Sequence, residues 1–227
     1  MVLAILTGMS HAPHARIEAL ELAGPAGRLE SLLNLGRPEA EYVAIVAHPH
    51  PLFGGTMHNK VVFHAMKALN SFGFPVLRFN FRGVGTSQGV HDNGRGEVED
   101  VQTALDYMKQ RFHLPLIFAG FSFGAATGLR AACPDPEVEA IVSIGTPIAA
   151  DDRVYQYNFL QSCGKPKLFI SGDRDEFAES DALSELIGTV PEPKSFVLIR
   201  DADHFFAGHL DEYRNAIEVW IKQTVMG

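Results

Sequence analysis

The sequence has little cysteine and no run of basic residues. Its two cysteines, Cys133 and Cys163, lack CxxC spacing and are too sparse for a disulfide framework, so we expect free thiols in a reducing compartment. The formal net charge is −8, and no lysine- or arginine-rich stretch offers a surface for a nucleic acid or an anionic membrane. We therefore expect neither of these as a partner.

The sequence also lacks a long apolar run, an internal repeat and a linker of low complexity. The opening segment MVLAILTGMSHAPHA has no basic region, and its apolar run ends at Thr7-Gly8, too early for a signal sequence or a membrane span. These absences predict a single domain over residues 1–227 and a cytoplasmic location. Hydrophobic residues make up 46% of the chain, which is enough to bury a core.

What the chain contains instead is an alternation of strand-like and helix-like segments. The segments RIEAL and RLESLLNL flank the turn AGPAG and predict an antiparallel hairpin. Continuous apolar runs then predict buried strands, and apolar residues at steps of three and four predict helices between them. The predicted strands are residues 42–47, 74–81, 116–121, 138–145, 166–172 and 195–202, and the predicted helices are residues 57–72, 98–112, a stretch that ends at 132, 180–188 and 210–220. This order is typical of an α/β fold with a mostly parallel sheet, helices on both faces, and ligands bound beyond the carboxyl ends of the strands.

The stretch GFSFG, residues 120–124, follows the strand-like run LIFA and precedes AATGLRAAC. This is the G-x-S-x-G pattern between a strand and a helix, in which a sharp turn presents the serine above the sheet. Gly120, Gly124 and Ala125 leave room around Ser122. A turn chosen only for tight packing would use the same glycines, and a phosphate loop fits less well because the Gly-Lys-Ser/Thr ending and the G-x-G-x-x-G spacing are both missing. We favour the interpretation of Ser122 as a nucleophile.

A serine nucleophile needs a base and an acid, and both residue types follow later predicted strands. Asp173 and Asp175 come after PKLFISG, while His204 comes after SFVLIRDAD and before the last helix. The order serine, aspartate, histidine is one of three orders found in serine hydrolases. We therefore expect His204 as the general base and one of the two aspartates as its partner, while Asp201 and Asp203 shape the loop of the histidine.

Five motifs in order, HPHPLFGGT, FNFRGVGTSQG, GFSFGA, ISGDRD and DADHFF, resemble the α/β-hydrolase superfamily. From about Tyr42 to the C-terminus the chain is similar to the small, nearly lidless dienelactone-hydrolase-like serine esterases. The resemblance implies an α/β-hydrolase fold with about eight strands and, at the usual place of a lid, only a short insertion over about residues 146–165. Dienelactone hydrolases proper have a cysteine where this chain has Ser122, so their lactone substrate is not implied. Family members carry the acid three residues after a glycine, which favours Asp175 over Asp173.

The resemblance also implies an oxyanion hole made of two backbone N–H groups. One belongs to Phe123, the residue after the nucleophile, and the other to the loop HPHPLF. Pro49 and Pro51 have no N–H to donate, which leaves His50 or Leu52. The match of LFG with dienelactone hydrolases favours Leu52.

The motif HPH has a second interpretation as a pair of metal ligands, His48 and His50. The prolines disturb that geometry and no third ligand is placed by the spacing, so we expect no metal and no cofactor, and we interpret His48 as a residue that shapes its loop. Asn80, where many α/β hydrolases have aspartate, is interpreted as structural. Solvated or packing roles suffice for the other histidines, which are His11, His14, His58, His64, His91, His113 and His209.

Together these residues predict a serine hydrolase. The leading hypothesis is a carboxylic ester hydrolase with a Ser122 acyl-enzyme, and thioesters or small amides are variations of it. A cofactor-free perhydrolase, similar to haloperoxidases, would use the same triad, and the third hypothesis is a noncatalytic binding protein on this fold. The expected partner is a small-molecule ester or related acyl compound, and a homodimer is left open. Aromatic residues near the predicted site favour an apolar acyl or alcohol group, although they would equally pack the loops; they are Phe53, Phe123, Phe205, Phe206, Tyr155, Tyr157 and Phe159.

Overall fold

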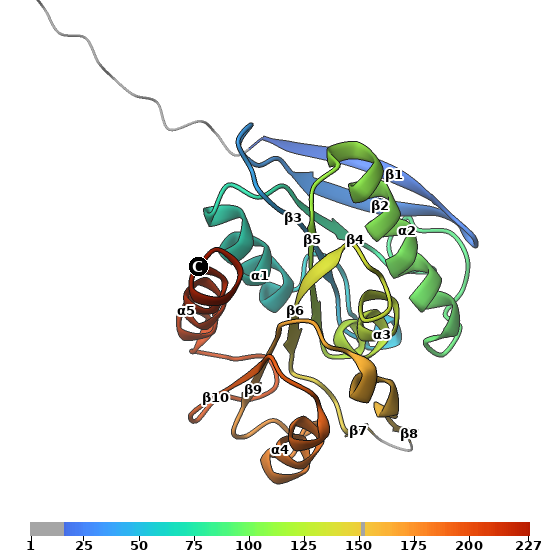
Figure 1. Ribbon diagram of the computed structural model, residues 1–227. Helices are drawn as coiled ribbons and strands as arrows, with labels where there is room; N and C mark the ends of the chain where they lie inside the picture. Colours follow the sequence, from blue (N-terminus) through green and yellow to red (C-terminus); the bar gives the residue numbers. More distant parts are fainter. Residues whose placement is uncertain (1–15, 151–152) are drawn as a thin grey trace, which may run out of the picture.

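A computed structural model of the chain describes residues 16–150 and 153–227. The opening apolar run, His11 and His14 lie outside these residues. Within them, a mixed sheet of eight strands forms the centre of the molecule, and helices lie on both of its faces (Figure 1). The fold class predicted from the sequence is confirmed.

The sheet is parallel except near one edge. Its spatial order is β1-β2-β4-β3-β5-β6-β9-β10, and β2 runs antiparallel to both of its neighbours while every other neighbouring pair is parallel. The central strands are buried on both faces, as their continuous apolar sequences require. The strands are β1 (Ile17–Gly24), β2 (Gly27–Asn34), β3 (Val43–Ala47), β4 (Val76–Phe79), β5 (Leu116–Phe121), β6 (Val138–Ile144), β9 (Lys167–Gly172) and β10 (Lys194–Ile199).

Strands β1 and β2 form the hairpin predicted around AGPAG. Their register runs from Ile17 opposite Asn34 to Gly24 opposite Gly27, so only two residues remain for the turn. Gly27 has a φ of +119°, a conformation that favours glycine. The hairpin therefore follows from local turn chemistry and adds the antiparallel edge to the sheet.

Helices cover the two faces of the sheet in pairs. α1 packs against α5 on one face and α2 packs against α3 on the other, to the left and right of the sheet in Figure 1. Each pair buries its own hydrophobic cluster against the strands, so the sheet separates two cores. On α1 the buried residues include Val61, Ala65, Met66 and Leu69, the face predicted from their spacing. The helices are α1 (Lys60–Ser71), α2 (Arg95–Phe112), α3 (Phe123–Ala132), α4 (Ser180–Thr189) and α5 (Leu210–Trp220), and the last continues into a π-helical turn, Ile221–Val225.

Two strands end earlier in the structure than in the prediction. Residues 74–81 and 195–202 read as continuous strands, whereas β4 covers only Val76–Phe79 and β10 ends at Ile199. Just after β4, the side chain of Asn80 adds bonds to neighbouring segments. Its carbonyl accepts the Met57 N–H at 2.8 Å and its amide donates to Glu30 at 2.8 Å, while the Asn80 backbone N–H still donates to the Glu30 carbonyl at 2.8 Å. Asn80 thus has the structural role that we expected.

The segment between β6 and β9 is a small insertion, as predicted. It contains a two-stranded ribbon, β7 (Ala149–Ala150) and β8 (Arg153–Val154), and a 3₁₀ helix, Asn158–Ser162, where the sequence predicted only a loop. Tyr157 anchors the segment because it is buried and its hydroxyl donates to the Pro147 carbonyl at 2.7 Å. A segment of this size leaves the nearby strand ends largely open.

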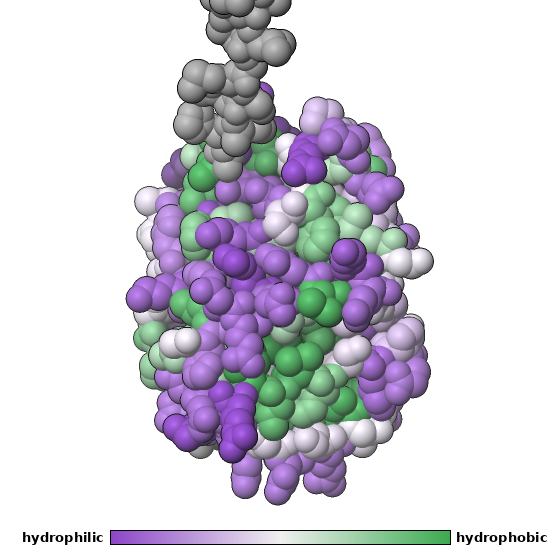
Figure 2. Space-filling view, turned by 90° about the vertical axis from the view of Figure 1, so that its left-hand side faces the viewer, coloured by the Kyte–Doolittle hydropathy of each residue, from purple (hydrophilic) through white to green (hydrophobic). Residues whose placement is uncertain are grey.

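The surface is mainly polar on the face seen in Figure 2. Apolar residues gather in the lower half of that face, the half that holds β9, β10 and α4 in Figure 1. None of the helices within residues 16–150 and 153–227 has the length and apolarity that a bilayer crossing needs.

Candidate active site

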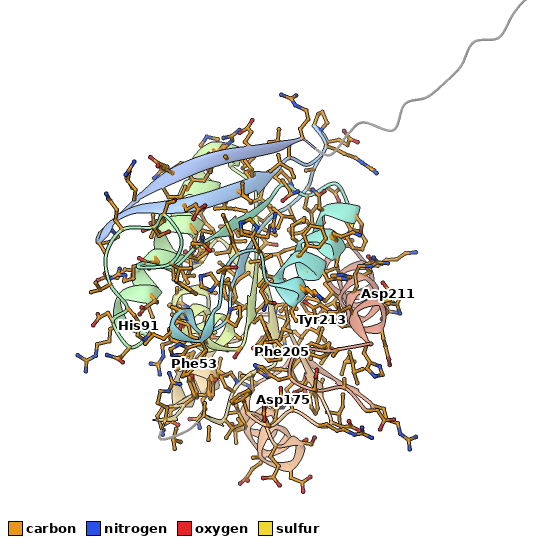
Figure 3. The ribbon with its side chains drawn as sticks, turned by 180° about the vertical axis from the view of Figure 1, so that it is seen from behind. Phe53, His91, Asp175, Phe205, Asp211 and Tyr213 are labelled. Atoms are coloured by element: carbon orange, nitrogen blue, oxygen red, sulfur yellow. The ribbon has the colours of Figure 1, made fainter. Side chains whose placement is uncertain are left out.

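Three parallel strands have their carboxyl ends on the same side of the sheet, and each is followed by a polar residue that the sequence analysis identified. Ser122 follows β5, Asp175 lies just after β9, and His204 lies in the loop after β10. Because β5, β6, β9 and β10 are consecutive in the sheet, their carboxyl ends bring these three side chains together. Figure 3 shows Asp175 at this end of the molecule with two of the surrounding aromatic residues, Phe53 and Phe205.

Ser122 stands at a sharp turn between β5 and α3. Its backbone has a φ of +56° and a ψ of −121°, a conformation that costs a non-glycine residue on the order of 1–3 kcal/mol. The flanking glycines permit the turn, because a Cβ at Gly120 would lie 2.6 Å from the Gly124 carbonyl oxygen and a Cβ at Gly124 would lie 2.4 Å from the His48 carbonyl oxygen. The Ser122 N–H donates to the Ile144 carbonyl at 2.8 Å and fixes the turn against β6. The stretch GFSFG therefore forms the elbow that its pattern predicts.

The imidazole of His204 joins Ser122 to Asp175. Its Nδ1 lies 2.9 and 2.8 Å from the two carboxylate oxygens of Asp175, and its Nε2 lies 2.9 Å from Ser122 Oγ. A carboxylate only accepts hydrogen bonds, so Nδ1 carries the proton and Nε2 has the lone pair that faces the serine hydroxyl. Three aromatic rings surround the imidazole at centroid distances between 4.7 and 5.2 Å; they belong to Phe121, Phe177 and Phe205.

Asp175 is buried, and its carboxylate is fully engaged. Besides the imidazole, it accepts the Phe177 N–H at 2.9 Å and the Ser171 hydroxyl at 3.2 Å. Asp173, the other aspartate considered, is exposed and takes no part in this network. The aspartate that contacts His204 is therefore Asp175, the one that the family resemblance favoured by its position three residues after a glycine.

The loop that carries His204 is shaped by the aspartates on either side. Asp203 accepts the N–H groups of Phe205 at 3.0 Å and Ala207 at 2.9 Å. Asp201 has a φ of +62° and pairs with Arg174. These contacts hold the loop from both ends, as we expected.

A pocket of about 310 Å³ opens over Ser122 and His204. Its volume is in the range of small-molecule sites, and its wall is mainly apolar. The sequence identified some of this wall but missed several members, because their position depends on how the loops pack. The missed residues include Asn59, Arg153 and Phe177, and only Phe177 had a sequence signal, its place two residues after the acid.

Two phenylalanines expected beside the site do not line the pocket. Phe206 is fully buried and stacks on Tyr213 of α5 at a centroid distance of 4.9 Å. Its φ of +54° turns it away from Phe205, which remains at the pocket. The ring of Phe123 is also buried and packs against His50 at 4.7 Å, beneath the pocket wall.

The loop after β3 supplies another side of the pocket. It contains a 3₁₀ turn, Pro51–Phe53, that ends at Gly54 with a φ of +77°. His50 lines the pocket, whereas Leu52 does not, and the Leu52 N–H donates to His50 Nδ1 at 3.2 Å. Among the described residues, the His50 N–H has no acceptor, and neither does the Phe123 N–H in the first turn of α3.

Comparison with known proteins assigns the chain to a family. A family model described as an alpha/beta hydrolase domain matches residues 41–223. The chain belongs to the alpha/beta hydrolase family. An uncharacterized protein of Rickettsia prowazekii is 37% identical over 205 residues, which are 87% of this chain and 86% of that protein.

Two solved structures extend the comparison. An α/β serine hydrolase without a lid from Xanthomonas campestris matches with a TM-score of 0.80 and 37% identity over 91% of this chain and 94% of that chain. A serine hydrolase homologue from Coxiella burnetii matches with a TM-score of 0.81 and 36% identity over 89% of this chain and 96% of that chain. The α/β-hydrolase fold and superfamily predicted from the motifs are confirmed, while the narrower dienelactone-hydrolase-like group stays a prediction.

His50 of this alpha/beta hydrolase meets a hydrogen-bond donor at each ring nitrogen. The Leu52 N–H faces Nδ1, and the Arg153 guanidinium contacts Nε2. Burial, together with the nearby Arg153 and His91, lowers the pKa of His50 to about 4, so the ring carries one proton at neutral pH. A neutral imidazole accepts at one nitrogen only. When it accepts from Arg153, Nδ1 carries the proton and the Leu52 N–H is released from this bond.

His48 of this alpha/beta hydrolase is committed to the backbone. It is fully buried, its Nδ1–H donates to the Pro49 carbonyl at 2.7 Å, and its Nε2 accepts the Phe81 N–H at 3.0 Å. Burial lowers the pKa of His48 to about 3, which keeps the ring neutral. Across residues 16–150 and 153–227, no three His, Cys, Asp or Glu side chains are grouped as a metal ion would need. His48 therefore shapes its loop, as expected.

Proposed function

We propose that this alpha/beta hydrolase is a carboxylic ester hydrolase in which Ser122, His204 and Asp175 form a catalytic triad. The observation that carries the proposal is the unbroken hydrogen-bond chain from Asp175 through His204 to Ser122 Oγ at an open, mainly apolar pocket. A nucleophilic serine needs this chain of base and acid, whereas a packing turn or a simple binding site does not.

In the proposed reaction, Ser122 Oγ attacks the carbonyl carbon of the ester. His204 Nε2 takes the hydroxyl proton as the Oγ–C bond forms, and the Asp175 carboxylate stabilises the imidazolium. When the C–O bond to the leaving group breaks, His204 gives the proton to the alcohol and an acyl-enzyme remains. Water, deprotonated by His204 in the same way, attacks the acyl carbon and releases the carboxylic acid and Ser122.

The oxyanion of each tetrahedral intermediate would be stabilised by the N–H groups of Phe123 and Leu52. The Phe123 N–H lies at the amino-terminal end of α3, where the helix dipole also favours negative charge. The support for Leu52 is that the neutral His50 ring carries one proton and accepts at one nitrogen only. When that nitrogen accepts from Arg153, the Leu52 N–H is released from His50. The His50 N–H, which has no acceptor among the described residues, is the alternative second donor.

The kind of substrate that we propose is based on the residues of the pocket wall. Phe53 and Phe205 line the pocket with 69% and 49% of their surfaces exposed, so apolar area is available to a ligand. This favours an apolar acyl or alcohol group next to the scissile carbonyl. The small insertion leaves the pocket open, which suits a small-molecule ester.

The proposal is tested by intact-mass analysis after treatment with a fluorophosphonate, which reports an activated serine without a known substrate. We expect one adduct on the wild-type protein, none on Ser122→Ala, and an unchanged adduct on the matched control Ser162→Ala, which alters an exposed serine. Ester hydrolysis, measured with the same three proteins, should fall by several orders of magnitude in Ser122→Ala alone. A folded wild-type protein without an adduct, or normal turnover by Ser122→Ala, would show that the mechanism is wrong.

A further inference from the structure

A second hollow, which we name the arginine groove, adjoins the active-site pocket. It has a volume of about 570 Å³ and lies between the amino-terminal end of α2, α3 and the strand β8. Arg153 and Tyr155 line both hollows, and Phe123, the residue after Ser122, lines the groove. The two hollows therefore share a wall formed by Arg153 and Tyr155.

Three arginines from three separate elements line this groove. They are Arg95 at the start of α2, Arg130 on α3 and Arg153 on β8, and no carboxylate of the described residues lines the groove. The chain as a whole has a net charge of −8, so a cluster of three cations departs from the general charge of the molecule. Among the described residues, the groove therefore gathers positive charge.

Two of the arginines keep most of their N–H donors unused by the described residues. Arg130 donates one N–H to the Gln156 carbonyl at 3.1 Å and stacks over the Phe159 ring at 5.1 Å, and a guanidinium has five N–H groups in total. Arg95 is exposed and forms no ion pair with any described residue. Arg153 has partners of its own, including the Phe53 ring at 5.4 Å, and these hold it at the junction of the two hollows.

The carboxylates within three residues of Arg95 in the sequence are engaged elsewhere. Glu97 is fully buried, pairs with His91 at 2.8 Å and accepts the Gly94 N–H at 2.8 Å. Asp92 accepts the Gly96 N–H at 3.1 Å. His91 is labelled in Figure 3 near this end of α2. Neither carboxylate lines the groove, so neither neutralises it directly.

We propose that the arginine groove binds an anionic group, carboxylate or phosphate, at the far end of the substrate. The ester or thioester cleaved at Ser122 then has an apolar group on one side of its carbonyl, in the aromatic pocket, and an anionic group on the other, in the groove. Guanidinium groups suit both anions because they donate two parallel N–H bonds to a pair of oxygens. This inference rests on the proposed function and adds a substrate class to it.

The test compares three 4-nitrophenyl esters of one acyl-chain length that end in a methyl, a carboxylate or a phosphate group. Release of 4-nitrophenol reports cleavage of the same ester bond in each. We expect the wild-type protein to have a KM about tenfold lower for the better of the two anionic substrates than for the methyl substrate, with similar kcat. Whichever anion gives the lower KM identifies the group, and the preference should shrink as salt screens the charges.

Variants locate the preference. The double variant Arg95→Gln, Arg130→Gln should raise KM for the anionic esters about tenfold and leave the methyl ester unchanged. A matched control, Arg28→Gln, removes a charge from β2, where Arg28 pairs with Glu21 at 3.0 Å, and should change neither. Circular dichroism melts check that each variant is folded.

Binding to Ser122→Ala, measured by calorimetry with the same esters, separates this inference from the proposed function. The groove is supported if Ser122→Ala binds an anionic ester more tightly than the methyl ester and the Ser122→Ala, Arg95→Gln, Arg130→Gln protein does not. This holds even if the wild-type protein hydrolyses none of the esters, a result that would contradict only the proposed function. Hydrolysis of all three esters with equal KM, or an anion preference that the double variant retains, overturns the groove and leaves the esterase intact.

Discussion

A single proton decides what His204 can do. Its Nδ1 faces two carboxylate oxygens at 2.8 and 2.9 Å, which forces the proton onto that nitrogen and leaves Nε2 to face Ser122. The carboxylate is itself fixed by the Phe177 N–H and the Ser171 hydroxyl, so the imidazole has one favoured orientation. The tautomer, and with it the proposed base, is therefore set by Asp175.

Asp175→Asn tests this dependence at constant side-chain size. A carboxamide can donate to Nδ1, which holds the histidine in the tautomer that has no lone pair toward Ser122. We expect kcat for ester hydrolysis to fall by about 10³- to 10⁴-fold with little change in the fold. The control Asp173→Asn changes an exposed carboxylate and should retain full activity. If Asp173→Asn were the damaging substitution, the assignment of the acid would be wrong.

At the scale of elements, the elbow depends on how closely α3 approaches β3. A Cβ at Gly124 would lie 2.4 Å from the His48 carbonyl oxygen and 2.7 Å from the Ala47 carbonyl carbon, and both are backbone atoms that cannot rotate away. The glycine therefore sets the spacing between the helix that begins after Ser122 and the loop that carries His50 and Leu52.

Gly124→Ala should force these two elements apart. We expect the free energy of unfolding to fall by about 2 kcal/mol or more, together with a loss of esterase activity, because the added methyl group has no room. Gly188→Ala is the matched control: its Cβ meets nothing within 4 Å, and Gly188 lies in the last turn of α4. Alanine there should leave the stability unchanged or raise it by up to about 0.5 kcal/mol. Denaturant titration measures both changes, and equal stability of the two variants would contradict this account of the elbow.

At the scale of the whole molecule, two buried histidines link stability to pH. The pKa of His48 is lowered to about 3 and that of His50 to about 4, mainly by burial, from an ordinary value of 6.5. Below pH 6.5 the unfolded chain takes up protons at these positions while the folded chain stays neutral. Stability is therefore fully present above pH 6.5 and is lost as the pH falls toward 4.

Urea titrations between pH 7 and pH 4.5 test this linkage. Each histidine should contribute a slope that approaches about 1.4 kcal/mol per pH unit. His48→Gln should be less stable at pH 7, because a buried hydrogen-bond pair is altered, but its pH dependence should be shallower. His58→Gln, at an exposed position, should reproduce the wild-type curve. A wild-type stability that does not change between pH 6.5 and pH 4.5 would refute the assignment.

The sequence by itself determined the features that depend on local chemistry. Alternating apolar segments predicted the order of the strands and helices, because backbone hydrogen bonding and burial act within each segment. GFSFG predicted the elbow because glycines at fixed offsets are the only residues that fit so tight a turn. The placement of Ser122, Asp175 and His204 after separate parallel strands predicted that they would meet, since those strand ends share one edge of the sheet.

Tertiary structure alone decided the features that depend on packing between distant segments. The sequence of residues 204–206, HFF, does not show that Phe205 lines the pocket while Phe206 enters the core. That difference depends on the positive φ of Phe206 and on its stacking against Tyr213 of α5. The meeting of Arg95, Arg130 and Arg153 at one groove likewise has no local pattern, since they come from three elements far apart in the chain. Chemistry within a few residues can be predicted from sequence; contacts made by side chains across the fold exist only once the segments are packed.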